Sequence, residues 1–488
     1  MEGTGIAQAP VDLGVSFLQA WPMQGMDPRT ERFAAPAVVD LFSGCGGFSL
    51  GFENAGFRIA ASVELDPSAR STHAANFPGA AHFCDVTRVD PDEVATALVG
   101  APFRVLIGGP PCQAYARVGR AKLRSVAARE KAHLDDPRVM LFRHWLRFVE
   151  AIRPEAVAME NVIDSLSFGG RNVMEETSEI LISLGYLPRY TILNAVHHGV
   201  PQIRDRAFLL AFRRDLGVEP VFPAPTHSHE LPRGYLHSRH VAVSGAGAAK
   251  SQYFVPPVHP ISSLPPARTV WEAIGDLPAL NGSMAAGARK GRRSTGSPTP
   301  YREGVQPSDY AADLRTWRGG DGATGHVTRA LGRDAILCSL MEPGTEYPAA
   351  HAIAESLLAS RIEALRQRGS SPDEAAISAL RSGIVPPHPP HTFPNRWWKM
   401  VADRPTRTLL AHLGKDGYSQ IHYDGEQGRV LSVREAARLQ SFPDAFRFEG
   451  TMNNAFRQIG NAVPPLLAQS IAASLWETAF GSAVPMAA

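Results

Sequence analysis

The sequence predicts an α/β protein with a mostly parallel sheet covered by helices on both faces, together with a smaller irregular region. Three observations support this fold class. Short apolar runs alternate with amphipathic stretches from residue 37 to about residue 212, the apolar runs are unbroken, and a glycine-rich turn follows the first of them. Ligands of such sheets bind beyond the carboxyl ends of the strands, so functional residues are expected there.

Seven apolar segments are expected to form the strands of this sheet. They are residues 37–42, 57–64, 80–85, 103–109, 155–162, 188–195 and 206–212. Helical patterns lie between them, and residues 138–152 form the clearest one because their apolar side chains recur at helical spacing.

The chain changes character after Asp215. Residues 216–300 are rich in Pro, His, Ser and Gly, and Lys plus Arg outnumber Asp plus Glu by nine to four over residues 281–333. Four of these cations, called the basic run below, are Arg289, Lys290, Arg292 and Arg293. We predict a disordered extension over 1–36, an α/β domain over 37–215, an irregular domain over 216–428 with an insertion near 352–382, and a segment over 429–480 that returns to the α/β domain.

Composition excludes several classes of protein. The 488 residues are 44% hydrophobic and 20% charged, as in a soluble globular protein, and the net charge of +2 provides no general attraction to nucleic acid. The four cysteines form no C-x-x-C pair, so we expect neither a disulfide framework nor a zinc site, and a reducing cytoplasm is the simpler setting. The first 36 residues lack a basic start and a long apolar core, so we expect neither a signal peptide nor an anchor there. No membrane span is expected because apolar runs stay well below about 18 residues.

The first motif is the glycine-rich segment DLFSGCGGFSLGFENAG at residues 40–56. Gly44, Gly46 and Gly47 would let the backbone approach a ligand, and Glu64 ends the next strand, where an acidic side chain grips ribose hydroxyls. Ser49 replaces the third glycine of the dinucleotide fingerprint, so the match is imperfect. The motif favours a nucleoside cofactor over the alternative, a tight turn needed only for packing.

The second motif, IGGPPCQAYA at residues 107–116, holds one thiol directly after two glycines and two prolines. Pro110 and Pro111 stiffen the segment, which places Cys112 in a held loop at the carboxyl end of a strand. A nucleophilic thiol would need cationic or hydrogen-bonding help to ionise at neutral pH. The alternative, a small buried hydrophobe, is the commoner fate of a lone cysteine.

Two further segments carry charged groups to strand ends. Glu160 closes an apolar strand, where desolvation should raise its pKa toward the range of a general acid; a solvated loop glutamate or a helix-cap contact is the alternative. Arg204 and Arg206 alternate with Gln202 on one face of an extended segment, which suits a phosphate, a carboxylate or a base oxygen. A structural salt-bridge network is equally compatible with these arginines.

The ordered set of motifs closely resembles the DNA cytosine carbon-5 methyltransferases. Six blocks between residues 40 and 465 carry the resemblance: the glycine-rich segment, GGPPCQAY, MENV, QIRDRAF, REAARLQSFPDAF and QIGNAVPP. The resemblance implies the S-adenosylmethionine-dependent, Rossmann-like fold for the catalytic lobe and identifies the irregular region as the target-recognition domain. It also implies that no metal is required.

The resemblance assigns roles residue by residue. Cys112 is the implied nucleophile, Glu160 the acid near the ring nitrogen and Arg206 the contact to the cytosine carbonyl, with Arg204 in support. The implied S-adenosyl-L-methionine site comprises Phe42, Gly44, Gly46, Gly47, Glu64, Asp85, Pro110 and Asn461. DNA contacts are expected from Gln113 and the basic run. One departure is Ala116, where many relatives carry serine; we expect a weakened hydrogen bond there, not inactivity.

The expected function is sequence-specific methylation of a flipped-out cytosine in double-stranded DNA, as the modification enzyme of a restriction-modification system. We also expect a monomer located in the bacterial cytoplasm or nucleoid. A cognate endonuclease that acts on the same site is a possible partner. The alternatives are an RNA cytosine methyltransferase of the same family and a non-catalytic DNA-binding regulator. A nicotinamide-dependent oxidoreductase explains only the glycine-rich segment.

Overall fold

A seven-stranded mixed sheet forms the centre of the computed structural model, which describes residues 35–111, 141–168, 170–245, 247–280, 298–320 and 322–481. The spatial order of the strands is β3-β2-β1-β4-β5-β7-β6. Their bounds are β1 Ala37–Leu41, β2 Arg58–Val63, β3 Ala81–Phe83, β4 Arg104–Gly108, β5 Ala156–Asn161, β6 Tyr186–Asn194 and β7 Asp205–Arg213. The predicted α/β class is confirmed, and the predicted strand bounds agree to within two residues.

The sheet is parallel from β3 to β5 and antiparallel beyond it. β7 pairs antiparallel with both β5 and β6, and Asn161 of β5 lies opposite Ala207 of β7. β7 therefore starts at the edge of the sheet where the parallel strands end. Residues at the carboxyl ends of β1, β4 and β5 and at the start of β7 are thus brought to one edge.

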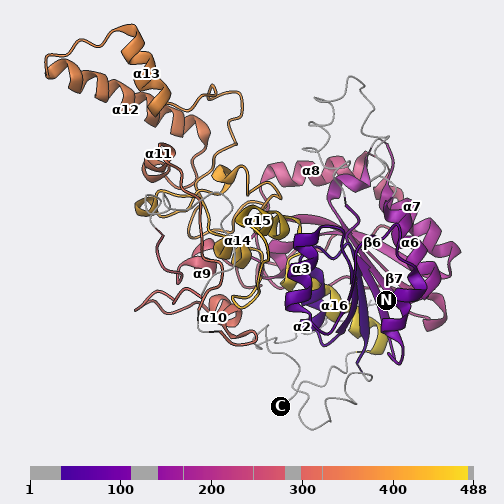
Figure 1. Cartoon of the computed structure of the whole chain (residues 1–488). Helices are drawn as coiled ribbons and strands as arrows, with labels where there is room; N and C mark the ends of the chain where they lie inside the picture. The colour runs from indigo at the N-terminus through magenta and orange to yellow at the C-terminus, as the bar shows by residue number, and fades with distance from the viewer. Residues whose placement is uncertain are drawn as a thin grey trace.

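Helices cover both faces of the sheet (Figure 1). Alternate strand residues point into two hydrophobic cores: Val38, Ile107 and Phe208 into one, and Val39, Leu106 and Leu209 into the other. The first core includes residues of α2 and α16, and the second includes residues of α6 and α7. The helices around the sheet are α2 Gly47–Asn54, α3 Pro67–Asn76, α4 Pro91–Ala95, α6 Leu141–Ile152, α7 Val173–Ser183, α8 Arg233–Ser244 and α16 Pro465–Phe480.

The α6 helix illustrates why these segments are helical. Its side chains Phe142, Trp145, Leu146 and Val149 recur at three- and four-residue spacing and are all buried. This helix lies within the predicted segment 138–152, of which residues 141–152 are described.

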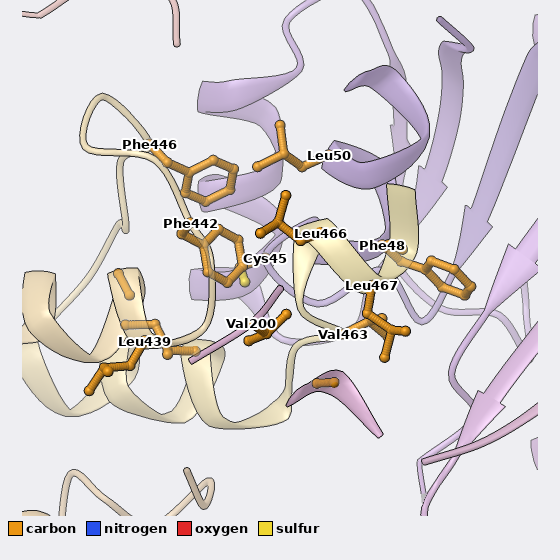
Figure 2. Packing of buried hydrophobic residues seen from close by; sticks show 14 of the residues in the cluster. Cys45, Phe48, Leu50, Val200, Leu439, Phe442, Phe446, Val463, Leu466 and Leu467 are labelled. Atoms are coloured by element: carbon orange, nitrogen blue, oxygen red, sulfur yellow. The ribbon is translucent and has the colours of Figure 1, made fainter. Parts of the chain in front are cut away.

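The C-terminal segment packs against the start of the α/β domain. Phe442, Val463 and Leu466 lie in one cluster with Cys45 and Leu50 from the glycine-rich segment, as Figure 2 shows. Packing against the cluster therefore joins parts of the chain that are about 400 residues apart in sequence. The domain division remains a prediction, and its first segment lies almost wholly outside the described residues.

The other α-helices of the described residues form a second lobe beside the sheet (Figure 1). They are α9 Val270–Ile274, α10 Asp309–Thr316, α11 Asp334–Leu340, α12 Tyr347–Gln367, α13 Glu374–Ile384, α14 Val433–Leu439 and α15 Met452–Asn461. The α12–α13 pair projects from this lobe and occupies the segment where the insertion is expected. Within the described ranges, no helix is long and apolar enough to cross a membrane.

Candidate active site at the carboxyl edge of the sheet

A buried ion pair lies where β5 ends and β7 begins. The Nε atom of Arg206 is 2.8 Å from Oε1 of Glu160, and the two side chains are only 14% and 11% exposed. A second guanidinium nitrogen of Arg206 donates to the carbonyl oxygen of Asp205 at 2.7 Å. The antiparallel direction of β7 places Arg206 beside Glu160, so the structure brings these two predicted residues together.

Burial dominates the acidity of Glu160. Desolvation raises the pKa of its carboxyl group above the usual value, and the nearby guanidinium groups of Arg206 and Arg204 only partly oppose this. The sequence-based expectation of a raised pKa therefore agrees with the environment of the carboxyl group. A group of this kind can remain protonated closer to neutral pH and act as an acid.

The end of β4 is held against the same pair. A Cβ atom at Gly109 would lie 3.0 Å from Oε2 of Glu160, so any larger residue there would press on the carboxylate. The amide of Asn161 donates to the carbonyl oxygen of Pro110 at 3.4 Å. Pro111 is the last described residue before Cys112, which, with Gln113 and Ala116, lies outside the described residues.

Arg204 is fully buried and contacts the main chain of later segments. Its guanidinium donates to the carbonyl oxygen of Leu409 at 2.9 Å, of Gly460 at 2.8 Å and of Ala462 at 3.2 Å. These bonds fasten the start of the strand to the segment that contains Asn461. Asn461 itself ends α15 and is exposed.

The glycine-rich loop and Glu64 form a second part of the site. Oε2 of Glu64 accepts from the backbone nitrogen of Gly44 at 2.9 Å, and Oε1 accepts from that of Asp66 at 2.7 Å. Desolvation raises the pKa of Glu64 while these two bonds oppose it. Each carboxylate oxygen keeps a further lone pair for a hydroxyl group.

The loop that follows β1 has an unusual backbone. Phe42, Gly44 and Gly46 all have positive φ angles, of 60°, 54° and 98°. For phenylalanine this left-handed conformation is uncommon, and such residues cluster at functional sites. Gly46 precedes α2, so the loop leads directly into the helix N-terminus.

Gly47 is required for packing within the chain. A Cβ atom there would collide with the carbonyl oxygen of Val463 and would lie 3.1 Å from Cβ of Ala462. Gly47 thus makes room for the C-terminal segment of the chain, whereas the sequence predicted that it makes room for a ligand.

The residue that breaks the glycine fingerprint has a buried partner. The hydroxyl of Ser49 donates to Oδ2 of Asp40 at 2.7 Å and lies 3.0 Å from Nε2 of His73. Desolvation raises the pKa of Asp40 to about 7. A third glycine could not bind this interior carboxyl group, which is a physical reason for serine at the position.

An open hollow of about 520 Å³ lies beside Glu64 and is lined by Leu65, Cys84, Asp85, Arg88 and Val89. Leu65 is 64% exposed and forms an apolar part of this lining. Sequence reasoning selected Asp85 but missed Leu65. Leu65 could have been found from the sequence, because it is an apolar residue in the loop directly after Glu64.

The basic run lies outside the described residues. In the part of the chain that is described, no group of three or more His, Cys, Asp or Glu side chains could hold a metal ion.

Comparisons with known proteins give a consistent result. A family model for C-5 cytosine-specific DNA methylase matches residues 37–252 and 390–477. M.OihORF3336P of Oceanobacillus iheyensis is 37% identical over 461 residues, covering 92% of this chain and 97% of that protein. The type II methyltransferase M.AgeI of Thalassovita gelatinovora is 31% identical over 464 residues, covering 90% of this chain and 98% of that protein.

A solved structure shows a similar fold. It is a protein encoded within an E. coli prophage, described as a "putative DNA modification methyltransferase", with a TM-score of 0.56 and 22% identity. The match covers 91% of this chain and 99% of that one.

Proposed function

Because the chain belongs to the C-5 cytosine-specific DNA methylase family and is thus a DNA (cytosine-5-)-methyltransferase, we propose that it methylates carbon 5 of a flipped-out cytosine through a covalent Cys112 adduct. The methyl donor is S-adenosyl-L-methionine, which supplies an electrophilic methyl group on a sulfonium. The observation that supports this mechanism best is the buried Glu160–Arg206 pair, directly beside the segment that leads to Cys112.

The chemistry explains why these residue types are needed. Carbon 5 of cytosine is a weak nucleophile, and addition of the Cys112 thiolate to carbon 6 converts the ring into an enamine. Glu160 gives its proton to ring nitrogen 3, while Arg206 donates to the carbonyl oxygen at carbon 2. Carbon 5 takes the methyl group, and the donor sulfonium leaves as a neutral thioether. A base then removes the carbon-5 proton, the bond between carbon 6 and the Cys112 sulfur breaks to release the thiolate, and ring nitrogen 3 returns its proton to Glu160.

The environment of Glu160 suits this role. A carboxyl group with a raised pKa remains protonated to a higher pH, so it can donate to the ring nitrogen. Arg206 is oriented by its bonds to Glu160 and to the Asp205 carbonyl, and a fixed guanidinium binds a carbonyl oxygen without reorganisation. We assign Arg204 to positioning, because its donors are already directed at main-chain carbonyls.

The cofactor assignment rests on the carboxyl ends of β1, β2 and β3. Glu64 has spare acceptor capacity for ribose hydroxyls. The hollow that begins at the next residue is lined by the exposed Leu65, an apolar surface, and by the carboxylate of Asp85. A nucleoside fits this set of groups. Phe42, Gly44, Gly46, Pro110 and Asn461 complete the proposed site, and Gly47 contributes through packing.

The biological setting follows from the relatives. One of the two relatives that match over their whole length, M.AgeI, is named a type II methyltransferase. We propose that this chain is likewise the modification enzyme of a restriction-modification system. It would act as a monomer on double-stranded DNA in the bacterial cytoplasm, with a cognate endonuclease that cuts the same unmethylated site. The basic run and Gln113 would contact the DNA.

The covalent step is tested with DNA that contains 5-fluorocytosine. Fluorine cannot leave carbon 5 as the proton does, so the adduct between Cys112 and carbon 6 should persist through denaturing electrophoresis. Cys112→Ala should form no adduct and transfer no methyl group, whereas the matched control Cys338→Ala, in the buried core of the second lobe, should do both. Methyl transfer by Cys112→Ala near the wild-type rate would refute the thiol mechanism.

Substrate class and target sequence are tested together. Incubation with S-adenosyl-L-methionine and unmethylated genomic DNA, followed by bisulfite sequencing, should show methylated cytosines in one short sequence context. Transfer to structured RNA instead of duplex DNA would favour the RNA alternative.

A further inference from the structure

The α8 helix contacts the segment that carries the catalytic arginine at two points. The hydroxyl of Tyr235 lies 3.3 Å from the carbonyl oxygen of Ile203, and Arg239 binds the side chain of Asp205. Tyr235 and Arg239 are four residues apart and therefore lie on one face of the helix. This face of α8 is directed at residues 203–205, immediately before Arg206.

Arg239 and Asp205 form a buried ion pair. Nε and a terminal nitrogen of Arg239 are 3.0 Å and 2.5 Å from the same oxygen, Oδ1 of Asp205. The side chains are 13% and 5% exposed. The same oxygen accepts from the amide of Asn194 at 2.8 Å, whereas no hydrogen bond to Oδ2 is found among the described residues.

The main chain of Asp205 is in turn bonded to the catalytic arginine. Its carbonyl oxygen accepts from Arg206, whose Nε binds Glu160. The side chain of Asp205 is thus fixed from α8, and its carbonyl helps to fix the guanidinium of Arg206. No contact between Arg239 and Glu160 is needed for this effect.

We propose that Arg239 is a positioning residue for methyl transfer, which holds Arg206 in the orientation needed at the cytosine carbonyl by clamping Asp205. The inference rests on the function proposed above. Removal of Arg239 leaves a buried carboxylate with a single partner, Asn194, and such a group is expected to move toward water. A displacement of about 1 Å at a catalytic group is enough to lower a rate by about 100-fold.

The test measures the single-turnover rate constant of methyl transfer, with enzyme in excess over a duplex DNA substrate. Arg239→Gln should lower this constant about 10- to 100-fold, while the KM for S-adenosyl-L-methionine stays within about twofold of the wild type. Arg239→Lys, which keeps a positive charge beside Asp205, should recover part of the loss. The cofactor hollow contains no residue of α8, so a change confined to the Asp205 contact should leave the KM unchanged. A general loss of structure would alter both the rate constant and the KM.

Arg213→Gln is the matched control. Arg213 lies at the opposite end of β7 and pairs with Glu155 at 2.7 Å, so this variant also removes a strand arginine–carboxylate pair. Its rate constant should remain within about twofold of the wild type. An equal loss in Arg239→Gln and Arg213→Gln would overturn the proposal, as would a wild-type rate constant in Arg239→Gln. Absence of methyl transfer by the wild-type chain would instead refute the proposed function.

A second measurement covers the case in which Arg239→Gln folds poorly. Arg239 and Asn194 line a cavity of about 280 Å³, so Arg239→Ala would leave space for a free guanidinium ion next to Asp205. Guanidinium at low millimolar concentration should raise the rate constant of Arg239→Ala several-fold and leave the wild type unchanged. No rise with guanidinium, when compared with an equal concentration of sodium, would overturn the proposal.

Discussion

Glu160→Gln separates the catalytic role of Glu160 from its effect on stability. Gln has nearly the same shape and can still accept a hydrogen bond from Arg206, but it has no acidic proton to transfer to ring nitrogen 3. Loss of a positioned acid typically lowers a rate about 10²- to 10⁴-fold, which corresponds to about 3 to 5 kcal/mol of transition-state stabilisation. We expect a loss of this size in the single-turnover rate constant.

The expected effect on stability has the opposite sign. Desolvation raises the pKa of Glu160 in the folded protein above its value in the unfolded chain, against the attraction of Arg206 and Arg204. The folded state then binds more protons, so ionisation of Glu160 lowers the free energy of unfolding as pH rises above the unfolded value of about 4.3. Glu160→Gln removes this penalty, and its Tm at pH 7 should equal or exceed that of the wild type.

Glu155→Gln provides the control on the other end of the same strand. Glu155 pairs with Arg104 and Arg213 at 2.8 Å and 2.7 Å, and these partners hold the pKa of Glu155 below its usual value despite burial. Its charge therefore stabilises the fold above the unfolded pKa, and this contribution is lost as pH falls through the folded pKa. Glu155→Gln should lower the Tm at pH 7 and leave the rate constant near wild type.

The assay is thermal unfolding of the three proteins across pH 4 to 8, combined with single-turnover methylation. The reasoning about Glu160 would be refuted by a Glu160→Gln variant that keeps the wild-type rate constant. A fall in its Tm at pH 7 as large as that of Glu155→Gln would show that ion pairing outweighs desolvation at this site.

Three further predictions concern packing, DNA binding and the buried ion pairs of the second lobe. Gly51→Ala should lower the free energy of unfolding by about 1 to 3 kcal/mol, because its Cβ atom would lie 2.6 Å from the carbonyl oxygen of Pro465 on α16. Gly383→Ala lies in α13, where no atom is within 4 Å of the new Cβ, and should instead raise the free energy of unfolding by about 0.5 to 1 kcal/mol. Chemical denaturation of both variants and the wild type measures these changes. Replacing the four cations of the basic run by glutamine should reduce the slope of log K against log salt by about 0.9 for each lost phosphate contact; an unchanged slope in a filter-binding titration would mean that they do not contact DNA. Arg438→Met should cost about 3 to 5 kcal/mol, because it leaves the buried carboxylates of Asp276 and Asp444 without their shared partner, and a wild-type denaturation midpoint would contradict this.

The sequence by itself determined the strands, their order along the chain and the residues at their ends. Burial and turn formation are local properties, so the apolar runs and the glycine and proline residues that follow them can be interpreted within about ten residues. For this reason Glu64 and Glu160 could be placed at strand ends, and a raised pKa expected for Glu160, before any three-dimensional information. The motif order indicated the family, and the comparisons confirm it.

Only the tertiary structure decided which of these residues meet. The antiparallel direction of β7 brings Arg206 to Glu160, whereas Arg204, two residues earlier, is used to hold carbonyls more than 200 residues away. The contact of Arg239 with Asp205 likewise spans two segments that no local pattern connects. Such pairings depend on how whole elements pack, because a side chain's partners are set by the three-dimensional arrangement of the backbone and not by its neighbours in sequence.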